Sequence, residues 1–444
     1  MTINPPAPDQ AAPPESGQPE SVQHTNNQTA DETVGLSVAR RYGLITGLYV
    51  TQFVGVGFLT VGLGVILREN GAALEQLAAL TLAGLIWPLK FLWAPLVDRW
   101  GSRRLGHYRG WLLVLQPLMV LAILAMIPFD DFGNLTPLIL LGVLLALLSA
   151  TQDTASDALA VLTMKGQSRG LTNGIQVMGG YLGNLLGGGV TVLVYAAFGW
   201  TAAICFLAVV TAIPLISIAT LREERVHRKV VPTAAEAFGA LGGVLRQPGA
   251  ALWALLIAPM GLSAVAIASG LTSPALIDAG WTVSQVGVLT GVVLGLAGIV
   301  GGLLGGVVIR RFGRVATYAG TSILLAIGIG LLVPTVLGTA DHVAVTVAVF
   351  GAFLAATASA AVVQTVSMDY ARPATAGTDF TLIVSVAQFW SFVIGAGALY
   401  AAAQFGYQPV MWTAVALVAL AGLLGTRHLS RHRRFLESAA ELHH

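Results

Sequence analysis

The segments 152–157, QDTASD, and 364–369, QTVSMD, are two copies of one pattern, a glutamine followed at the fifth position by an aspartate. The offset between them also takes Gln176 to Gln388. Polar residues are rare in the apolar stretches of this chain, so shared polar positions in one register indicate that the second half repeats the first. Polar groups at equivalent depths of two halves are typical of a two-lobed transporter.

The composition places this repeat in lipid. The chain has 444 residues, of which 55% are hydrophobic and only 10% are charged. A soluble globular domain does not have this balance. Apolar runs of about 20 residues, the length that crosses a bilayer, predict an all-α integral membrane protein with twelve transmembrane helices in two six-helix repeats. The runs are centred near Gly55, Ile86, Met119, Leu147, Leu182, Val210, Leu262, Leu296, Leu325, Gly351, Ala387 and Leu417.

The distribution of polar segments predicts the domain boundaries. Residues 1–38 are rich in Pro, Gln and Asn and lack any apolar run, so we expect a disordered cytoplasmic tail without a cleaved signal peptide. Residues 39–222 form the predicted N-terminal lobe and 250–428 the predicted C-terminal lobe. A cytoplasmic inter-lobe loop is expected at 223–249, and a basic cytoplasmic tail at 429–444.

Basic residues predict the orientation. Among the 23 Lys and Arg, all but Arg68 and Lys90 fall in the two tails or in the loops after even-numbered runs. By the positive-inside rule, both termini are cytoplasmic. The segments 71–76 and 280–285 share a Gly-x4-Gln pattern and enter their runs from the same side, so the two repeats are expected to be parallel. Because the basic loops act as topological signals, we do not expect a nucleic-acid partner.

Three charged residues inside the apolar runs form a candidate proton-coupling network. Asp153 and Asp157 are one helical turn apart in the fourth run and share a face. Close carboxylates repel, so one is expected to keep its proton to a higher pH than an isolated aspartate. Lys90 lies in the second run and needs a partner there, which we expect to be one of these acids or an anionic substrate. The alternative is a fixed Lys–Asp bridge between packed helices without a role in transport.

The loop after the second run contains the candidate gating residues Asp98, Arg99, Arg103 and Arg104. It resembles the signature loop of major facilitators, whose Asp and Arg form bridges that close the inner gate in one state. The resemblance implies the major facilitator fold. In this chain the glycine follows the acidic residue instead of preceding it, and the second copy at 310–313 lacks the acid, which departs from the family pattern.

A closer resemblance covers the segments 89–116 and 149–169, which include KFLWAPLVDR and SATQD. These are similar to the AmpG-type muropeptide permeases and their relatives, including acetyl-CoA transporters. Within that branch, the opening Tyr49-Val-Thr-Gln52, the segment 68–71 and room for only twelve helices look most like the RhtX/FptX-type siderophore importers. This resemblance implies a monomeric secondary transporter without a cofactor. It would import a metal-loaded siderophore across the bacterial inner membrane by alternating access, with protons as the coupling ion.

The sequence is also compatible with other functions. One is an AmpG-type permease for muropeptides or another bulky anionic metabolite. The others are a drug or metabolite exporter and a non-transporting membrane assembly factor or sensor. No motif in the sequence identifies a siderophore-binding site directly.

Polar and aromatic residues at mid-membrane positions are the predicted substrate-binding residues, because ligand pockets combine apolar walls with a few hydrogen-bonding groups. The first half also carries the acids, whereas Thr365 and Arg310 stand at the positions equivalent to Asp153 and Asp98. We therefore expect the first half to couple and gate and the second half to shape the substrate side. The candidates are Gln52, Trp87, Gln152, Asn173, Gln176, Tyr181, Gln364, Gln388 and Trp390, with plain packing as the alternative for the tryptophans.

Glycine-rich faces in the fifth run, 179–189, and the eighth run, 291–306, predict close helix packing. In the facilitator fold these helices meet across the lobe interface, where smooth surfaces would permit rocking. Packing within each lobe is the alternative.

Enzyme and metal functions find no support in the sequence. The eight His are scattered without a metal-ligand spacing, and no phosphate-binding loop ends in Gly-Lys-Ser or Gly-Lys-Thr. The single cysteine, Cys205, excludes a disulfide within the chain. We therefore expect no metal centre, no cofactor and no direct use of ATP.

Overall fold

The structure is a computed structural model that describes residues 38–70, 86–102, 104–164, 168–220, 238–239, 241–336 and 341–432. Within these residues every regular element is a helix, apart from one isolated bridge between Ser102 and Gly106. The all-α prediction is confirmed. Nearly all of the predicted tail at 1–38, much of the inter-lobe loop at 223–249 and most of the tail at 429–444 lie outside the described residues.

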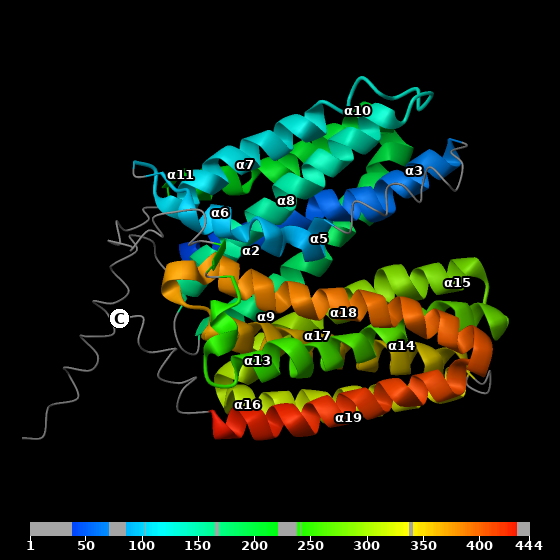
Figure 1. Cartoon of the computed structure of the whole chain (residues 1–444). Coiled ribbons are helices and arrows are strands. Elements are labelled where there is room, and N and C mark those ends of the chain that lie inside the picture. The colour runs from blue at the N-terminus through cyan, green and yellow to red at the C-terminus, as the bar shows by residue number, and fades with distance from the viewer. Residues whose placement is uncertain are drawn as a thin grey trace, which may run out of the picture.

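The helices form two bundles that lie one above the other (Figure 1). The first bundle contains α2 (Val38–Gly57), η1 (Phe58–Gly62), α3 (Leu63–Glu69), α5 (Ile86–Leu89), η3 (Lys90–Leu92), α6 (Ala94–Arg99), α7 (His107–Leu124), α8 (Thr136–Thr163), α9 (Ser168–Asn184), η4 (Leu185–Val190), α10 (Thr191–Ala212) and α11 (Pro214–Thr220). The second contains η5 (Gly243–Arg246), α13 (Ala250–Leu252), η6 (Trp253–Ile257), α14 (Ala258–Asp278), α15 (Val283–Val288), η7 (Leu289–Val293), α16 (Leu294–Val336), α17 (His342–Tyr370), η8 (Pro373–Thr375), α18 (Ala376–Phe405) and α19 (Tyr407–Arg431).

The described residues include nine stretches that are long and apolar enough to span a membrane. Two of them, Ser168–Thr220 and Gln285–Pro334, have about twice the length that one crossing needs. Each is interrupted by a glycine with positive φ, Gly199 at 81° and Gly313 at 78°, where the chain turns back. The predicted second span lies partly within 71–85, outside the described residues. The observed helices are consistent with the predicted twelve.

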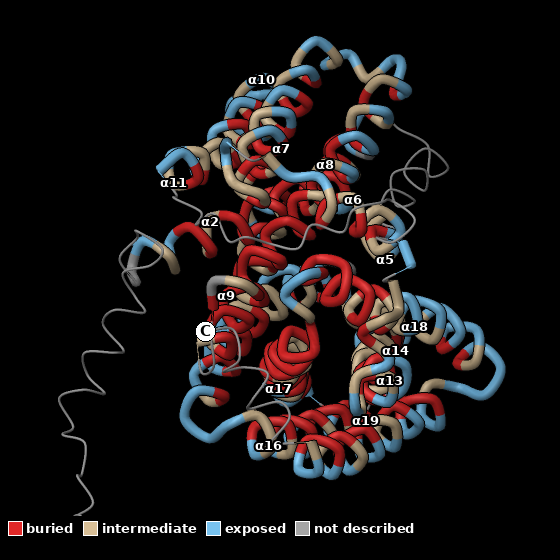
Figure 2. Tube along the Cα trace, turned by 60° about the vertical axis from the view of Figure 1, so that its left-hand side comes forward, coloured by how far each residue is buried: buried red, intermediate tan, exposed pale blue. Residues whose placement is uncertain are grey.

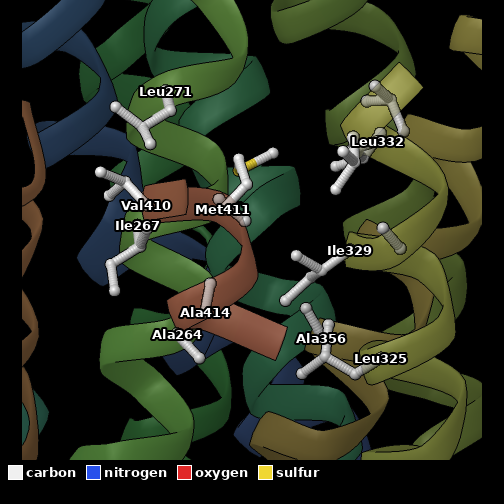
Figure 3. Close-up of a cluster of buried hydrophobic side chains, with 14 of the residues drawn as sticks. Ala264, Ile267, Leu271, Leu325, Ile329, Leu332, Ala356, Val410, Met411 and Ala414 are labelled. Carbon is white, nitrogen blue, oxygen red and sulfur yellow. The ribbon is translucent and has the colours of Figure 1, made fainter. Parts of the chain in front are cut away.

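The outward-facing sides of the helices carry many exposed apolar side chains. Turns that face the bundle interiors are buried, and outward turns are exposed (Figure 2). Large apolar side chains such as Phe198, Val343 and Phe405 are more than 70% exposed. In water this would leave a large unfavourable area, whereas in lipid the same side chains match their solvent. The second bundle encloses its own apolar core, with Ile267 and Met411 on one side and Leu325 and Ile329 on the other (Figure 3).

Among the described residues, α9 and α18 make the most extensive contacts between the two bundles. The helix α9 packs along α16 and α17, and α18 packs against α6 and α8. At the α9–α16 crossing, a Cβ on Gly174 would lie 2.6 Å from the carbonyl oxygen of Gly302, so only glycine permits this approach. The ring of Tyr181 covers Gly298 in the same interface.

The glycines predicted to make this interface divide between two roles. A Cβ on Gly183 would lie 2.3 Å from the Val50 carbonyl oxygen, and one on Gly187 would lie 1.9 Å from that of Val54. Both contacts lie inside the first bundle, against α2. The prediction that these fifth-run glycines line the interface between the lobes was therefore wrong, because this part of the helix turns them toward α2. They follow the alternative, which was packing inside one lobe. The interface uses the earlier Gly170 and Gly174 instead.

Candidate functional site

Lys90 lies at a break in the helix that contains it. The chain passes from α5 through the short 3-10 segment η3 to α6. Pro95, near the start of α6, has no N–H to give and crowds the carbonyl group four residues earlier, which disfavours a continuous α-helix. The break points Lys90 into the first bundle, where its side chain is 2% exposed.

Lys90 and Asp153 form a buried ion pair. The Nζ of Lys90 donates to Oδ2 of Asp153, and the Nε2 of Gln52 donates to Oδ1 at 2.7 Å. The Lys90 ammonium also lies 5.3 Å from the centre of the Trp87 ring. Because the Asp153 side chain is only 3% exposed, each charge has the other as its main compensation. The structure thus assigns Lys90 to Asp153, which the sequence left open.

Asp157 lies one turn farther along α8 and has different partners. Its Oδ1 accepts hydrogen bonds from the hydroxyl of Tyr49 at 3.1 Å and from Nε2 of Gln176 at 2.9 Å. Its Oδ2 is buried and has no hydrogen-bond partner among the described residues. Tyr49 and Gln52 are three residues apart on one face of α2, and the antiparallel pairing of α2 with α8 brings them to Asp157 and Asp153 respectively. Tyr49 was not among the predicted site residues.

The remaining polar candidates of the first half are buried close to this network. Gln152 donates weakly to the Leu48 carbonyl oxygen at 3.3 Å. Asn173 donates to the Arg169 carbonyl oxygen at 2.8 Å. The side-chain oxygens of Gln152, Asn173 and Gln176 have no donor among the described residues. Such oxygens are able to accept hydrogen bonds from a ligand or solvent.

Each of the three aromatic candidates contacts another aromatic ring. Trp87 packs on Phe53, with ring centres 5.1 Å apart. Tyr181 meets Phe353 of the second bundle edge to face at 5.7 Å. Trp390 is 45% exposed and contacts Phe389.

In the second half, the side-chain oxygens of Gln364 and Gln388 are buried without a donor among the described residues. Their role in substrate binding, like that of Trp390, stays a prediction. In the same bundle, Asp379 binds Arg372, whose Nη2 donates to it at 2.8 Å. The hydrogen bonds with Asp379 hold the pKa of the Arg372 guanidinium above its ordinary value.

Asp98 joins the two bundles. Its oxygens accept from the backbone N–H groups of Gly377 at 3.1 Å and Thr378 at 2.7 Å, in the first turn of α18. The hydroxyl of Tyr108 in the first bundle donates to the same carboxylate at 2.5 Å. Helix N-termini favour a negative charge, so Asp98 stabilises contact between the bundles.

The arginines predicted to act with Asp98 are placed differently. Arg99 has a buried Nη1 without a hydrogen-bond partner among the described residues, and Arg104 is exposed. Arg103 lies outside the described residues. The hydrogen bonds to the Asp98 carboxylate described above thus come from two backbone N–H groups and the Tyr108 hydroxyl, and not from the predicted arginines.

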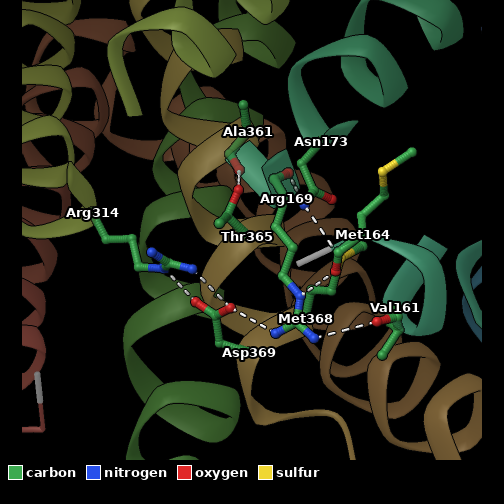
Figure 4. Close-up of polar contacts among 9 residues, drawn as sticks. All are labelled: Val161, Met164, Arg169, Asn173, Arg314, Ala361, Thr365, Met368 and Asp369. Carbon is green, nitrogen blue, oxygen red and sulfur yellow. Dashed lines mark hydrogen bonds and ion pairs between the residues drawn. The ribbon is translucent and has the colours of Figure 1, made fainter. Parts of the chain in front are cut away.

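A second cross-bundle contact surrounds Asp369 (Figure 4). Nη1 of Arg169 from α9 donates to Oδ1 at 2.9 Å, and Nη2 of Arg314 from α16 donates to the same oxygen at 3.0 Å. Nε of Arg314 binds Oδ2. Arg169 and Asp369 are fully buried. Both arginines were interpreted only as orientation signals, although the repeated Gln-x4-Asp pattern had already singled out Asp369.

Comparisons with known proteins identify the family to which this chain is related. Residues 45–396 match the Major Facilitator Superfamily model. The anhydromuropeptide permease of Escherichia coli is 34% identical over 242 residues, which cover 54% of this chain and 49% of the permease. The putative transporter AmpG 4 of Rickettsia conorii is 26% identical over 265 residues, covering 57% of this chain and 63% of that protein. The matched regions thus span about half to two thirds of these relatives.

A solved structure supports the same fold. The Major Facilitator Superfamily transporter FucP in its outward conformation superposes with a TM-score of 0.67 at 10% identity, covering 86% of this chain and 98% of FucP. Such identity shows the fold alone. Together with the family match over most of the chain, it places the protein among multi-pass membrane transporters rather than enzymes. The chain belongs to the Major Facilitator Superfamily.

Proposed function

We propose that this chain is a proton-coupled secondary transporter that imports a bulky anionic solute of the AmpG-permease type across the bacterial inner membrane by alternating access. The observation that carries the proposal is the buried Lys90–Asp153 pair with Asp157 one turn away. Ionisable groups inside a membrane are costly and mark pathways for ions or substrates more often than they stabilise a fold. The similarity to the anhydromuropeptide permease makes an anhydromuropeptide the first solute to test.

The Lys90–Asp153 pair suits an anionic substrate. A carboxylate from the substrate could bind the Lys90 ammonium beside Asp153, because an ammonium has three N–H donors and need not release its first partner. Trp87 beside the ammonium offers an apolar ring face for the uncharged part of the solute. Gln52 and Gln152 present oxygens that accept hydrogen bonds from hydroxyl or amide groups. This combination of one cation, ring faces and amides fits a sugar–peptide acid.

Alternating access needs contacts that form in one state and break in the other. The contacts of Asp98 with α18 and of Arg169 with Asp369 cross the two bundles at the end that the basic residues predict to be cytoplasmic. We assign both contacts to the gate that closes this end. Opening the gate exposes Asp98, Arg169 and Asp369 to water, which solvates the charges that the contacts had compensated.

A siderophore is the second candidate substrate, favoured by the sequence opening Tyr49-Val-Thr-Gln52. In the structure, Tyr49 and Gln52 bind Asp157 and Asp153. Because these residues have a role in holding the acid pair, they are expected in any transporter that uses the pair. They therefore do not favour a siderophore over a muropeptide, and the AmpG-type substrate comes first.

Uptake measurements test the proposal. In this assay, cells that express the chain are given labelled anhydromuropeptide or labelled iron–siderophore, with and without a proton uncoupler, and the label inside the cells is measured. We expect uncoupler-sensitive accumulation of the anhydromuropeptide, lost in Lys90→Met and retained in the matched control Arg427→Gln, which changes an exposed cation. Accumulation of the siderophore alone would replace the substrate assignment. Accumulation of neither solute by a well-folded protein would contradict both.

A further inference from the structure

Asp157 and Asp369 occupy equivalent positions of the two repeats, but their surroundings differ in charge. Asp369 binds two guanidinium groups, from Arg169 and Arg314 (Figure 4). Among the residues that the structure describes, Asp157 receives hydrogen bonds only from the neutral Tyr49 and Gln176, both at one oxygen. Guanidinium partners stabilise an ionised carboxylate. A buried carboxylate with one bare oxygen and only neutral donors is far better accommodated with a proton on that oxygen.

Counting the charges around Asp157 leads to the same conclusion. The charged or titratable groups that face it are Asp153 on its own helix, Lys90 on η3 and Tyr49 on α2. Lys90 binds Asp153, so its positive charge is already compensated. One ammonium and two carboxylates leave a net charge of −1 in a buried site, and one proton on an acid makes the site neutral. Asp153 has the ammonium and Gln52 as donors, so the proton belongs on Asp157.

Among the described residues around the two acids, hydrogen-bond acceptors outnumber donors. The amide nitrogens of Gln52, Gln152 and Gln176 all donate, whereas their oxygens have no donor among the described residues. An ionised Asp157 adds another acceptor without a donor. A protonated Asp157 instead adds one O–H donor to a region with an excess of acceptors.

We propose that Asp157, and not Asp153, carries the coupled proton, and that Tyr49 is a positioning residue that stabilises Asp157 when the proton has left. This inference rests on the proposed proton-coupled transport and names the acid that performs it. The Oδ2 of Asp157 takes one proton from water on the outer side and returns it to water on the inner side, so no bond other than O–H forms or breaks. The Lys90–Asp153 pair remains ionised and serves the anionic substrate.

Infrared spectroscopy of the purified protein tests the assignment without any substrate. A protonated carboxyl group gives a C=O band that an ionised one lacks. We expect this band at neutral pH in the wild type and in Asp369→Asn, the repeat-matched control whose acid is held ionised by arginines. We expect its loss in Asp157→Asn. A wild type without the band, or a band that persists in Asp157→Asn and disappears in Asp153→Asn, would overturn the assignment.

The variant Tyr49→Phe separates positioning from simple packing. It removes one of the two hydrogen bonds that stabilise the ionised Asp157 and leaves the ring in place. The pH at which the carboxyl band disappears is expected to rise by about one unit. An unchanged midpoint in a folded Tyr49→Phe protein would remove Tyr49 from the proposal.

Transport in proteoliposomes then tests the coupling itself, with labelled anhydromuropeptide as the probe. Asp157→Asn should retain exchange of solute between the two sides but lose accumulation driven by a pH gradient. Gradient-driven accumulation by Asp157→Asn would refute the proton role of this residue. A wild type that exchanges solute without any response to the gradient would instead refute the proposed proton coupling, even if the infrared band is assigned to Asp157.

Discussion

The hydrogen bonds from α18 to Asp98 predict how strongly one residue controls the equilibrium between closed and open gates. The carboxylate accepts two N–H groups from the other bundle, at Gly377 and Thr378, and is only 5% exposed. A hydrogen bond to a charged group contributes about 1.5–3 kcal/mol. With the lower value for each, Asp98→Ala destabilises the closed gate by about 3 kcal/mol, which is a change of roughly 100-fold in the closed-to-open ratio.

Graded variants make this magnitude testable. Asp98→Asn keeps an oxygen acceptor but loses the charge, so we expect a shift of roughly 10-fold because neutral hydrogen bonds contribute about half as much. Tyr108→Phe removes the Tyr108–Asp98 bond inside the first bundle and leaves both N–H groups of α18 bound to Asp98, so its effect should be smaller than that of either Asp98 variant. The order Asp98→Ala, Asp98→Asn, Tyr108→Phe is the signature of a contact that acts between the bundles.

Distances between two spin labels measure the gate directly. Cys205 is first replaced by serine, and labels are attached to cysteines introduced at two exposed positions, Thr220 at the end of α11 and Arg311 beside the Gly313 turn within α16. Double electron–electron resonance then gives the populations of short and long distances. An Asp98→Ala protein that remains folded and changes this ratio by less than about threefold would refute the calculation. A shift toward the short distance would refute its direction.

Further predictions follow from the same contacts. Lys90→Met leaves Asp153 buried without its cation and should destabilise the protein by about 3–5 kcal/mol, whereas the double variant with Asp153→Asn should recover most of that loss in a thermal unfolding assay. Asp369→Asn should also lower thermal stability, because it leaves two arginines without their shared acid, and an unchanged melting temperature would count against the contact. Gly187→Ala should reduce the yield of folded protein, since its Cβ would lie 1.9 Å from a backbone oxygen. Gly64→Ala, with nothing within 4 Å, should fold normally, and equal yields would contradict the packing of η4 on α2.

Much of the site could be predicted from the sequence because its members are rare residues in an apolar chain. Lys90, Asp153 and Asp157 stand out by charge alone, and the one-turn spacing of the two acids follows from helix geometry. Tyr49 was missed as a ligand of Asp157 because a tyrosine in an apolar run carries no such signal. Arg169 was missed because a basic residue near a predicted helix end also has a topological explanation.

The sequence by itself determined that the chain spans a membrane as helices and that its halves are related, since hydropathy, helical period and repetition are local properties of the chain. The tertiary structure decided which groups meet. Lys90 and Asp153 are 63 residues apart, Arg169 and Asp369 are 200 apart, and Asp98 reaches Gly377 across 279. Such pairs depend on the rotation of each helix about its axis and on the crossing of two bundles. Packing of all the helices together sets these quantities, and no single segment encodes them.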